Sequence, residues 1–187
     1  MASLTRLAIG YAIAAVVGVL LGIVMTMIGP WNLGITPLLA ALLAIPSVAY
    51  VPLSIVWFGP TNVAVVAVVA LVASPPIATG TVRGLTAVPL RYKQAAKVLG
   101  ASGFFYLRTI VMPSAGPNLI AGAQQGWTFA WRALVSGELL IKGGIGLGRS
   151  LETARASDDL ATVFAVLAVI AFFSLALDTF LRRMAEN

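Results

Sequence analysis

The sequence predicts an all-α membrane protein, a polytopic bundle of about five transmembrane helices with a helical loop on the cytoplasmic side. Of the 187 residues, 60% are hydrophobic and only 10% are charged, whereas soluble domains carry about 25% charged residues. No acidic or basic residue occurs from Leu7 to Val82, which leaves room for three crossings of roughly 20 residues. Spanning segments must be helices or closed barrel strands. The strict alternation of barrel strands is absent, so we expect helices.

Five apolar segments follow one another in what we expect to be a single transmembrane domain covering residues 1–187. The first two end at Gly29–Asn32 and Gly59–Asn62, and each of these sequences combines Gly, Pro and Asn, which favour turns. The expected segments are 7–28, 35–58, 63–81, 117–141 and 160–181.

The first segment carries small residues at four-residue spacing, namely Gly10, Ala14, Gly18 and Gly22. Such a stripe lets another helix approach closely, because dispersion rather than water exclusion drives helix packing in lipid. Packing within the chain is the favoured interpretation, and a seam between two subunits is the alternative.

Prolines interrupt the second and third segments: Pro46 and Pro52 in the second, Pro75 and Pro76 in the third. Proline frees a backbone carbonyl and kinks a helix. In a membrane this is tolerated where the backbone lines a cavity or packs on protein. These prolines therefore indicate either walls of a pathway or ordinary kinks in the bundle.

Charge sets the expected orientation. Five basic residues and no acid lie between the third and fourth segments: Arg83, Arg91, Lys93, Lys97 and Arg108. The positive-inside rule places such a loop in the cytoplasm. The N-terminus and the stretch 152–159 are then outside, and the tail after Arg182 and Arg183 is cytoplasmic. Arg6 is an exception to the rule. The net charge of +6 is explained by this topology, so no nucleic-acid partner is expected.

Composition excludes most catalytic chemistry. The chain has no Cys and no His, and its six acidic residues are scattered. Disulfides, thiolate metal sites and histidine bases are therefore impossible, and neither a catalytic triad nor a metal cluster can be assembled. We expect a non-catalytic chain without a metal site.

The basic loop, residues 83–113, predicts a helix–glycine–helix elbow. Pro89 suits the first turn of a helix, and 91–99 forms that helix. Gly100 suits a left-handed C-terminal cap, and Ser102 can cap a second helix, 103–112. Pro113 is expected to end this second helix.

The elbow resembles the Glu-Ala-Ala loop of binding-protein-dependent ABC import permeases: Gln94-Ala95-Ala96 is followed by Gly100, Pro113 and Pro117. In that family the loop forms a coupling helix that docks into a cleft on the ATPase subunit. Gln94 replaces the usual Glu and so removes one charge. The resemblance implies ATPase coupling by nine residues: Tyr92, Lys93, Gln94, Ala95, Ala96, Lys97, Gly100, Ala101 and Ser102.

Other sequences resemble the nitrate/sulfonate/taurine branch of these importers, among them Ile45–Pro46, Trp57–Gly59 and Trp131–Val135 with Glu138. That branch usually has an extra helix before the core, which this sequence does not contain; either the sequence starts late, or the protein is a five-helix version of the fold. The resemblance implies a bacterial inner-membrane permease for a small solute, an anion by analogy with the branch. It also implies a second permease subunit, identical or related, two cytoplasmic ATPases that bind ATP and Mg, and an external binding protein. No cofactor is expected in this chain.

Two ionisable residues, Arg132 and Glu138, lie in the otherwise apolar fourth segment. Such residues face a partner or a wet cavity. At a separation of six residues they lie on different helix faces and are not expected to pair. Arg132 is a candidate for meeting an anion, although a structural bridge to another helix is favoured, and Glu138 is expected near the outer edge. With Pro46, Pro52 and Pro75, they form the set of pathway candidates.

Two further patterns carry less weight. Gly143–Ser150 nearly fits a phosphate-binding loop, but Arg149 replaces the lysine and no strand precedes it, so an external loop or gate is expected. Asp178 is expected to meet Arg182 at i, i+4.

An ATP-independent secondary transporter or channel is the alternative function. It would need inverted repeats or ion-coupling carboxylates. A membrane scaffold or exporter component is a second alternative.

Overall fold

The computed structural model describes residues 2–28, 32–141 and 145–186, without the side chains of 32–36, 104, 107, 177, 180–182 and 184–186. The described residues are helical and contain no strand, so the predicted all-α membrane bundle is confirmed. The helices are α1 (Ala2–Met27), α2 (Asn32–Ala44), α3 (Tyr50–Phe58), α4 (Asn62–Thr86), α5 (Leu90–Val98), α6 (Gly103–Tyr106), α7 (Met112–Leu140), α8 (Leu147–Ala156) and α9 (Leu160–Glu186). A 3₁₀ turn (Ser47–Ala49) precedes α3, and a π turn (Leu107–Val111) joins α6 to α7.

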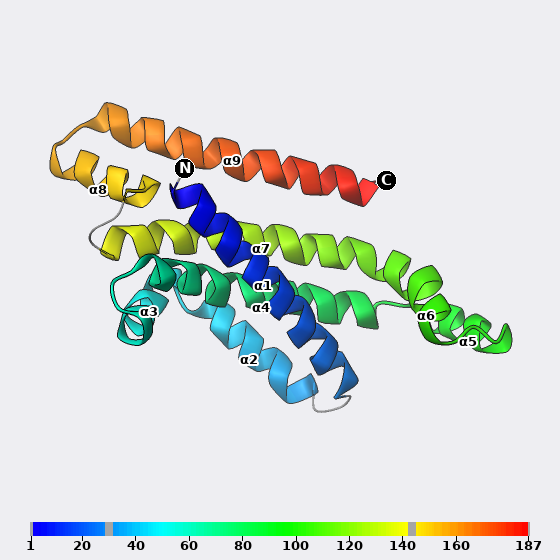
Figure 1. Cartoon of the computed structure of the whole chain (residues 1–187). Coiled ribbons are helices and arrows are strands. Elements are labelled where there is room, and N and C mark those ends of the chain that lie inside the picture. Colours follow the sequence, from blue (N-terminus) through cyan, green and yellow to red (C-terminus); the bar gives the residue numbers. More distant parts are fainter. Residues whose placement is uncertain (1, 29–31, 142–144, 187) are drawn as a thin grey trace.

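Helices α4, α7 and α9 run roughly along one direction and α1 crosses them obliquely, while the short helices α3, α5, α6 and α8 lie at the two ends (Figure 1). Helices α5 and α6 project from one end of the bundle, where α4 ends and α7 begins. The start of α1 lies at the opposite end with α3 and α8, and α9 runs back toward the end that carries α5 and α6. The N-terminus and the projecting elbow are therefore at opposite ends of the bundle.

Two helices, α1 and α4, are long and apolar enough to cross a membrane. The pair Pro37–Ala44 and Ser47–Phe58, bent by 89°, counts as a third crossing if it is one broken span. Helices α7 and α9 contain 29 and 27 residues and exceed the roughly 20 residues that a span requires. The expected total of five spans is reached when these two helices and the bent pair are included.

Glycines in α1 bring it into direct contact with α4. A Cβ atom at Gly10 would lie 2.7 Å from Cβ of Val69, and one at Gly18 would lie 2.7 Å from the carbonyl oxygen of Ser74. A Cβ atom at Gly22 would overlap Thr81. The predicted packing of this small-residue stripe within the chain is therefore confirmed.

A second glycine contact, which the sequence did not predict, joins α4 to α7. Gly80 and Gly122 face each other so closely that a Cβ atom at Gly122 would lie 2.8 Å from Cα of Gly80 and 3.1 Å from the carbonyl oxygen of Pro76. The two backbones meet without intervening side chains, which maximises dispersion contact where water exclusion contributes little. Helix α4 thus lies between α1 and α7 and forms the buried core of the bundle.

The predicted continuous segment 35–58 is wrong, because the chain bends between α2 and α3 at Pro46. Proline at this position cannot donate to the carbonyl of Leu42 and clashes with it. The hydroxyl of Tyr50 donates to that carbonyl oxygen at 2.9 Å. The free acceptor is therefore satisfied after the chain has turned, which stabilises the bend.

Helix α4 passes through Pro75 and Pro76 without a break. The carbonyl of Leu71 loses its helical donor to Pro75, and the hydroxyl of Ser74 donates to that carbonyl oxygen at 3.3 Å. A serine beside a proline is a common way of satisfying a freed carbonyl in a membrane helix.

Four other predictions about the bounds of elements are wrong. The fourth segment begins at Met112 rather than at residue 117, and Pro113 does not end a helix, because the chain passes from the π turn Leu107–Val111 directly into the first turn of α7, which contains Pro113. Helix α4 continues to Thr86 instead of ending at residue 81. The expected loop at 143–150 is helical from Leu147 onward in α8, and residues 143 and 144 lie outside the described residues.

Candidate functional site

The elbow consists of α5, a tight turn and α6. Pro89 precedes α5 with an extended backbone (φ −59°, ψ 142°). At the other end, the N–H of Ala101 donates to the carbonyl of Ala96 at 2.9 Å, and the N–H of Gly100 donates to that of Lys97 at 3.2 Å. This pair of bonds is a Schellman cap, which requires a left-handed residue. Gly100 has φ +70°, so its predicted role is confirmed.

The surface of the elbow is apolar and basic. Val98 and Leu99 at the turn are 87% and 83% exposed. Leu90, Tyr92 and Phe105 are also exposed. Isolated exposed apolar residues are ordinary, but a cluster of them beyond a membrane bundle indicates an interaction surface.

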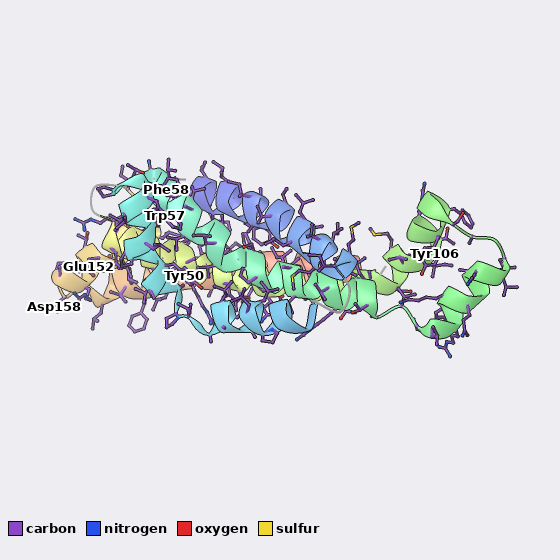
Figure 2. All side chains as sticks on the ribbon, turned by 90° about the horizontal axis from the view of Figure 1, so that it is seen from below. Tyr50, Trp57, Phe58, Tyr106, Glu152 and Asp158 are labelled. Carbon is purple, nitrogen blue, oxygen red and sulfur yellow. The ribbon has the colours of Figure 1, made fainter. Side chains whose placement is uncertain are left out.

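All nine residues predicted to couple to an ATPase lie in α5 or in the turn that follows it. Ala96 is the buried residue of α5, every residue of which is described, whereas Lys93, Gln94 and Lys97 are exposed. The guanidinium of Arg91 lies 5.1 Å from the centre of the Tyr92 ring. Figure 2 shows Tyr106 on this projecting part, far from Tyr50 and Glu152 at the other end.

The five pathway candidates do not form one site. Pro46 and Pro52 are exposed, on either side of the 3₁₀ turn, and Pro75 is buried inside α4. Arg132 is exposed on α7, and Glu138 is 4% exposed. As expected, no ion pair joins Arg132 to Glu138.

Glu138 instead binds the start of α1. Its carboxylate accepts hydrogen bonds from Nη1 of Arg6 at 2.6 Å, from the hydroxyl of Ser3 at 3.0 Å and from the N–H of Gly148 at 3.0 Å. Arg6 also donates to the carbonyl of Ile145 at 3.1 Å. This cluster holds together the start of α1, the end of α7 and the start of α8.

The charge of Arg6 is neutralised by Glu138 in a largely buried pair, so Arg6 adds no free positive charge at this end of the bundle. Sequence reasoning missed the pair because the two residues are 132 positions apart. One observation could have indicated the pair: Arg6 and Glu138 are isolated charged residues, and both were expected near the outer edge of the membrane.

Helix α8 carries a second, exposed ion pair at the same end of the bundle. The carboxylate of Glu152 lies 3.2 Å from Nη2 of Arg155. The hydrogen bond and the charge of Arg155 lower the pKa of Glu152. Such surface pairs contribute little to stability.

The described residues contain no group of three or more potential metal ligands. The predicted contact between Asp178 and Arg182 involves a side chain that lies outside the described residues.

The fold and the elbow define an all-α integral membrane protein that presents a capped helical turn beyond its membrane bundle. The family of binding-protein-dependent transport system inner membrane components matches residues 8–186. The chain belongs to this family, as its resemblance in the elbow indicated.

Several named relatives align with nearly all of the chain. A putative ABC transporter permease of Methanocaldococcus jannaschii is 32% identical over 99% of this chain and 69% of its own length. The bicarbonate transport system permease of Synechococcus elongatus is 31% identical over 96% of this chain and 64% of its own length. The nitrate import permease of Synechocystis is 32% identical, over 96% and 65%. The chain therefore spans about two thirds of the length of these relatives.

Proposed function

We propose that this chain is the transmembrane permease subunit of an ABC importer and forms a transport pathway together with a second permease subunit. Membership of the transport-system family supports the proposal, as do the names of relatives that import bicarbonate and nitrate. The second subunit is a copy of this chain or a related chain. Two ATPases, which bind ATP and Mg, and an external binding protein complete the proposed complex.

The exposed elbow is the observation that carries the proposal. Its turn is fixed by a Schellman cap, so its shape does not depend on the partner. Its apolar tip, Val98 and Leu99, is suited to a cleft on a soluble protein, and Lys93 and Lys97 add a basic surface. The replacement of Glu by Gln94 leaves this geometry intact, because the cap depends on Gly100.

The proposed orientation places the elbow in the cytoplasm of a bacterial cell, with the chain in the inner membrane. The basic residues of the elbow favour that side. The N-terminus would then be outside, since it lies at the opposite end of the bundle, and the C-terminus would be cytoplasmic (Figure 1).

The proposed solute is a small anion. Relatives named for bicarbonate, nitrate and aliphatic sulfonates support this class. The external binding protein would select the solute, and ATP-driven closure of the ATPases would move the elbow and switch the pathway from outward-open to inward-open. Such a switch requires contacts that differ between the two states, and the elbow supplies a surface for them.

The cap residue provides the sharpest test. Gly100 needs a left-handed backbone, and a Cβ atom there would meet nothing within 4 Å. Replacement by Val therefore introduces backbone strain, about 1–2 kcal/mol, without a clash. Gly100→Asn is the matched control, because Asn tolerates this conformation. We expect the Val variant to insert normally but to lose ATPase binding and solute-stimulated ATP hydrolysis, and we expect the Asn variant to keep both.

A second pair of variants tests the surface itself. Leu99→Glu places a charge on the elbow, and Ile145→Glu places the same charge on an equally exposed residue at the other end of the bundle (83% and 86% exposed). Only Leu99→Glu should release the ATPase during purification in mild detergent. The proposal fails if the wild-type complex contains no ATPase. It also fails if complexes that contain Gly100→Val or Leu99→Glu hydrolyse ATP as fast as the wild-type complex does.

A further inference from the structure

One face of α7 is polar although the protein lies in a membrane. Residues spaced by three or four positions share this face: Ser114, Asn118, Ala121, Gln125, Thr128, Arg132 and Ser136. We call it the polar face of α7. Gln125, Thr128 and Arg132 are exposed, and Asn118 and Ser136 are partly exposed. The opposite side of α7, with Gly122, Gly126 and Ala130, packs on the bundle.

The exposed faces of the other long helices have the reverse character. On α1 the exposed residues include Val16 (61%) and Leu20 (56%), and on α9 they include Phe164 and Phe172 (both 68%). Among the described residues of α7, the large exposed apolar side chains are Met112 and Leu140, its first and last residues. Helices α1 and α9 are thus suited to lipid, whereas a polar surface is costly there.

Arg132 is the charged residue of this face, and within the described chain no carboxylate forms an ion pair with it. The other charged residue of α7, Glu138, is already bound to Arg6. The guanidinium of Arg132 lies 5.6 Å from the centre of the Phe129 ring. This contact restrains the side chain while the ring offers no hydrogen-bond acceptor, so the planar guanidinium keeps donors for an anion.

The bend between α2 and α3 lies next to the polar face. The hydroxyl oxygens of Ser47 and Ser136 are 3.3 Å apart, and Ser136 also donates to the carbonyl of Arg132 at 2.8 Å. Arg132 is six residues beyond the middle of the 29-residue helix, or about 9 Å toward the end where Glu138 binds Arg6. A polar surface with one cation therefore extends through the depth of the bundle.

We propose that the polar face of α7 is a wall of the water-filled pathway and that Arg132 is an anion-binding residue in it. This inference rests on the proposed permease function and adds a location and a residue to it. The solute is a small anion that exchanges part of its hydration for the guanidinium of Arg132, while Gln125 and Thr128 provide neutral hydrogen-bonding groups along the wall. The interpretation favoured from the sequence was a structural bridge from Arg132 to another helix. In the described part of the chain no carboxylate forms an ion pair with Arg132.

The absence of cysteine in the sequence allows a direct test. Gln125→Cys and Thr128→Cys report on the polar face, and Val16→Cys on α1 is the lipid-facing control. Each variant of the assembled complex, in native membrane vesicles permeabilised so that reagent reaches both sides, is treated with an anionic methanethiosulfonate and with its cationic trimethylammonium analogue. We expect fast labelling at residues 125 and 128 with both reagents and no labelling at residue 16.

The ratio of the anionic to the cationic labelling rate then measures the field of Arg132. An axial separation of four residues is about 6 Å, and one of seven residues is about 10 Å. At low ionic strength and in a water-like dielectric, Arg132→Gln should lower the ratio about tenfold at residue 128 and about fourfold at residue 125. Arg132→Lys should keep it. Use of the ratio removes any effect of Arg132 on the reactivity of the thiol itself.

Each outcome separates this inference from the permease proposal. If residues 125 and 128 are as unreactive as residue 16, the face is covered by lipid or by the second subunit, and the inference is wrong. An unchanged ratio in Arg132→Gln refutes the anion site. In both cases an ATPase that still co-purifies leaves the proposed function standing, whereas loss of the ATPase from the unmodified complex counts against that function alone.

Discussion

Removal of the Glu138 carboxylate should destabilise the protein more than the loss of any other acidic side chain described above. The Glu138→Ala variant loses three hydrogen bonds, from Arg6 at 2.6 Å, from Ser3 at 3.0 Å and from the N–H of Gly148 at 3.0 Å. It also leaves the guanidinium of Arg6, whose side chain is 11% exposed, without its counter-ion. Loss of one partner of a buried pair costs about 3–5 kcal/mol.

For a chain of this size, 1 kcal/mol corresponds to about 2–4 °C in the unfolding midpoint, so we expect a decrease of about 6–20 °C. The assay is thermal unfolding of the purified protein in detergent, followed by circular dichroism. Glu152→Ala is the matched control, because Glu152 is also paired with an arginine but its side chain is 35% exposed, against 2% for that of Glu138. It should leave the midpoint nearly unchanged.

A double variant isolates the pair. Arg6→Ala combined with Glu138→Ala should lower the midpoint by clearly less than the sum of the two single changes, since the second change removes a charge that the first left unpaired. The assigned role of the cluster is refuted if Glu138→Ala unfolds within about 2 °C of the wild type, which corresponds to less than about 1 kcal/mol, or if the two single effects simply add.

The glycine contact between α4 and α7 and the cap of α9 give two further predictions. Gly122→Ala should destabilise the protein by about 1–3 kcal/mol, because a Cβ atom there meets the backbone of Gly80 at 2.8 Å. A Gly to Ala change inside a helix otherwise gains helix propensity, so an unfolding midpoint equal to or above that of the wild type would contradict the contact. The pKa of Asp159 is lowered by hydrogen bonds from the hydroxyl and then the N–H of Thr162. Its folded pKa is below the ordinary value of 3.8, so its contribution to stability is fully present above that value and is lost as the pH falls through the folded pKa. Asp159→Ala should therefore lower the midpoint at pH 7 and converge with the wild type in acid, and a difference independent of pH would show that the carboxylate does not cap α9.

The sequence predicted those features that depend on local composition. The run without charges from Leu7 to Val82 identified the first membrane segments, because each residue in lipid is selected for being apolar. Pro89 and Gly100 identified the elbow, because each fixes the backbone at one position. The small-residue stripe of α1 predicted close packing within the chain. The structure shows this packing, since Gly10 of the stripe contacts Val69 of α4.

The remaining features depend on residues that meet only after folding. Gly80 and Gly122 are recognisable as small residues, but nothing local indicates that they face each other. The bend at Pro46 could not be distinguished from a kink, because it depends on whether Tyr50 reaches the freed carbonyl of Leu42. The polar face of α7 was missed because the exposure of Gln125 is decided by which side of α7 packs on α4.

The glycine contact between α4 and α7 also has a mechanical consequence. These two helices are the ones that enter and leave the elbow (Figure 1). Since their backbones touch at Gly80 and Gly122, neither can slide or tilt alone without opening a void, and close-packed interiors resist such deformation. A displacement of the elbow would thus move α4 and α7 together as one rigid body. Arg132 on α7 would move with them, although it lies some 30 residues along the chain from the elbow.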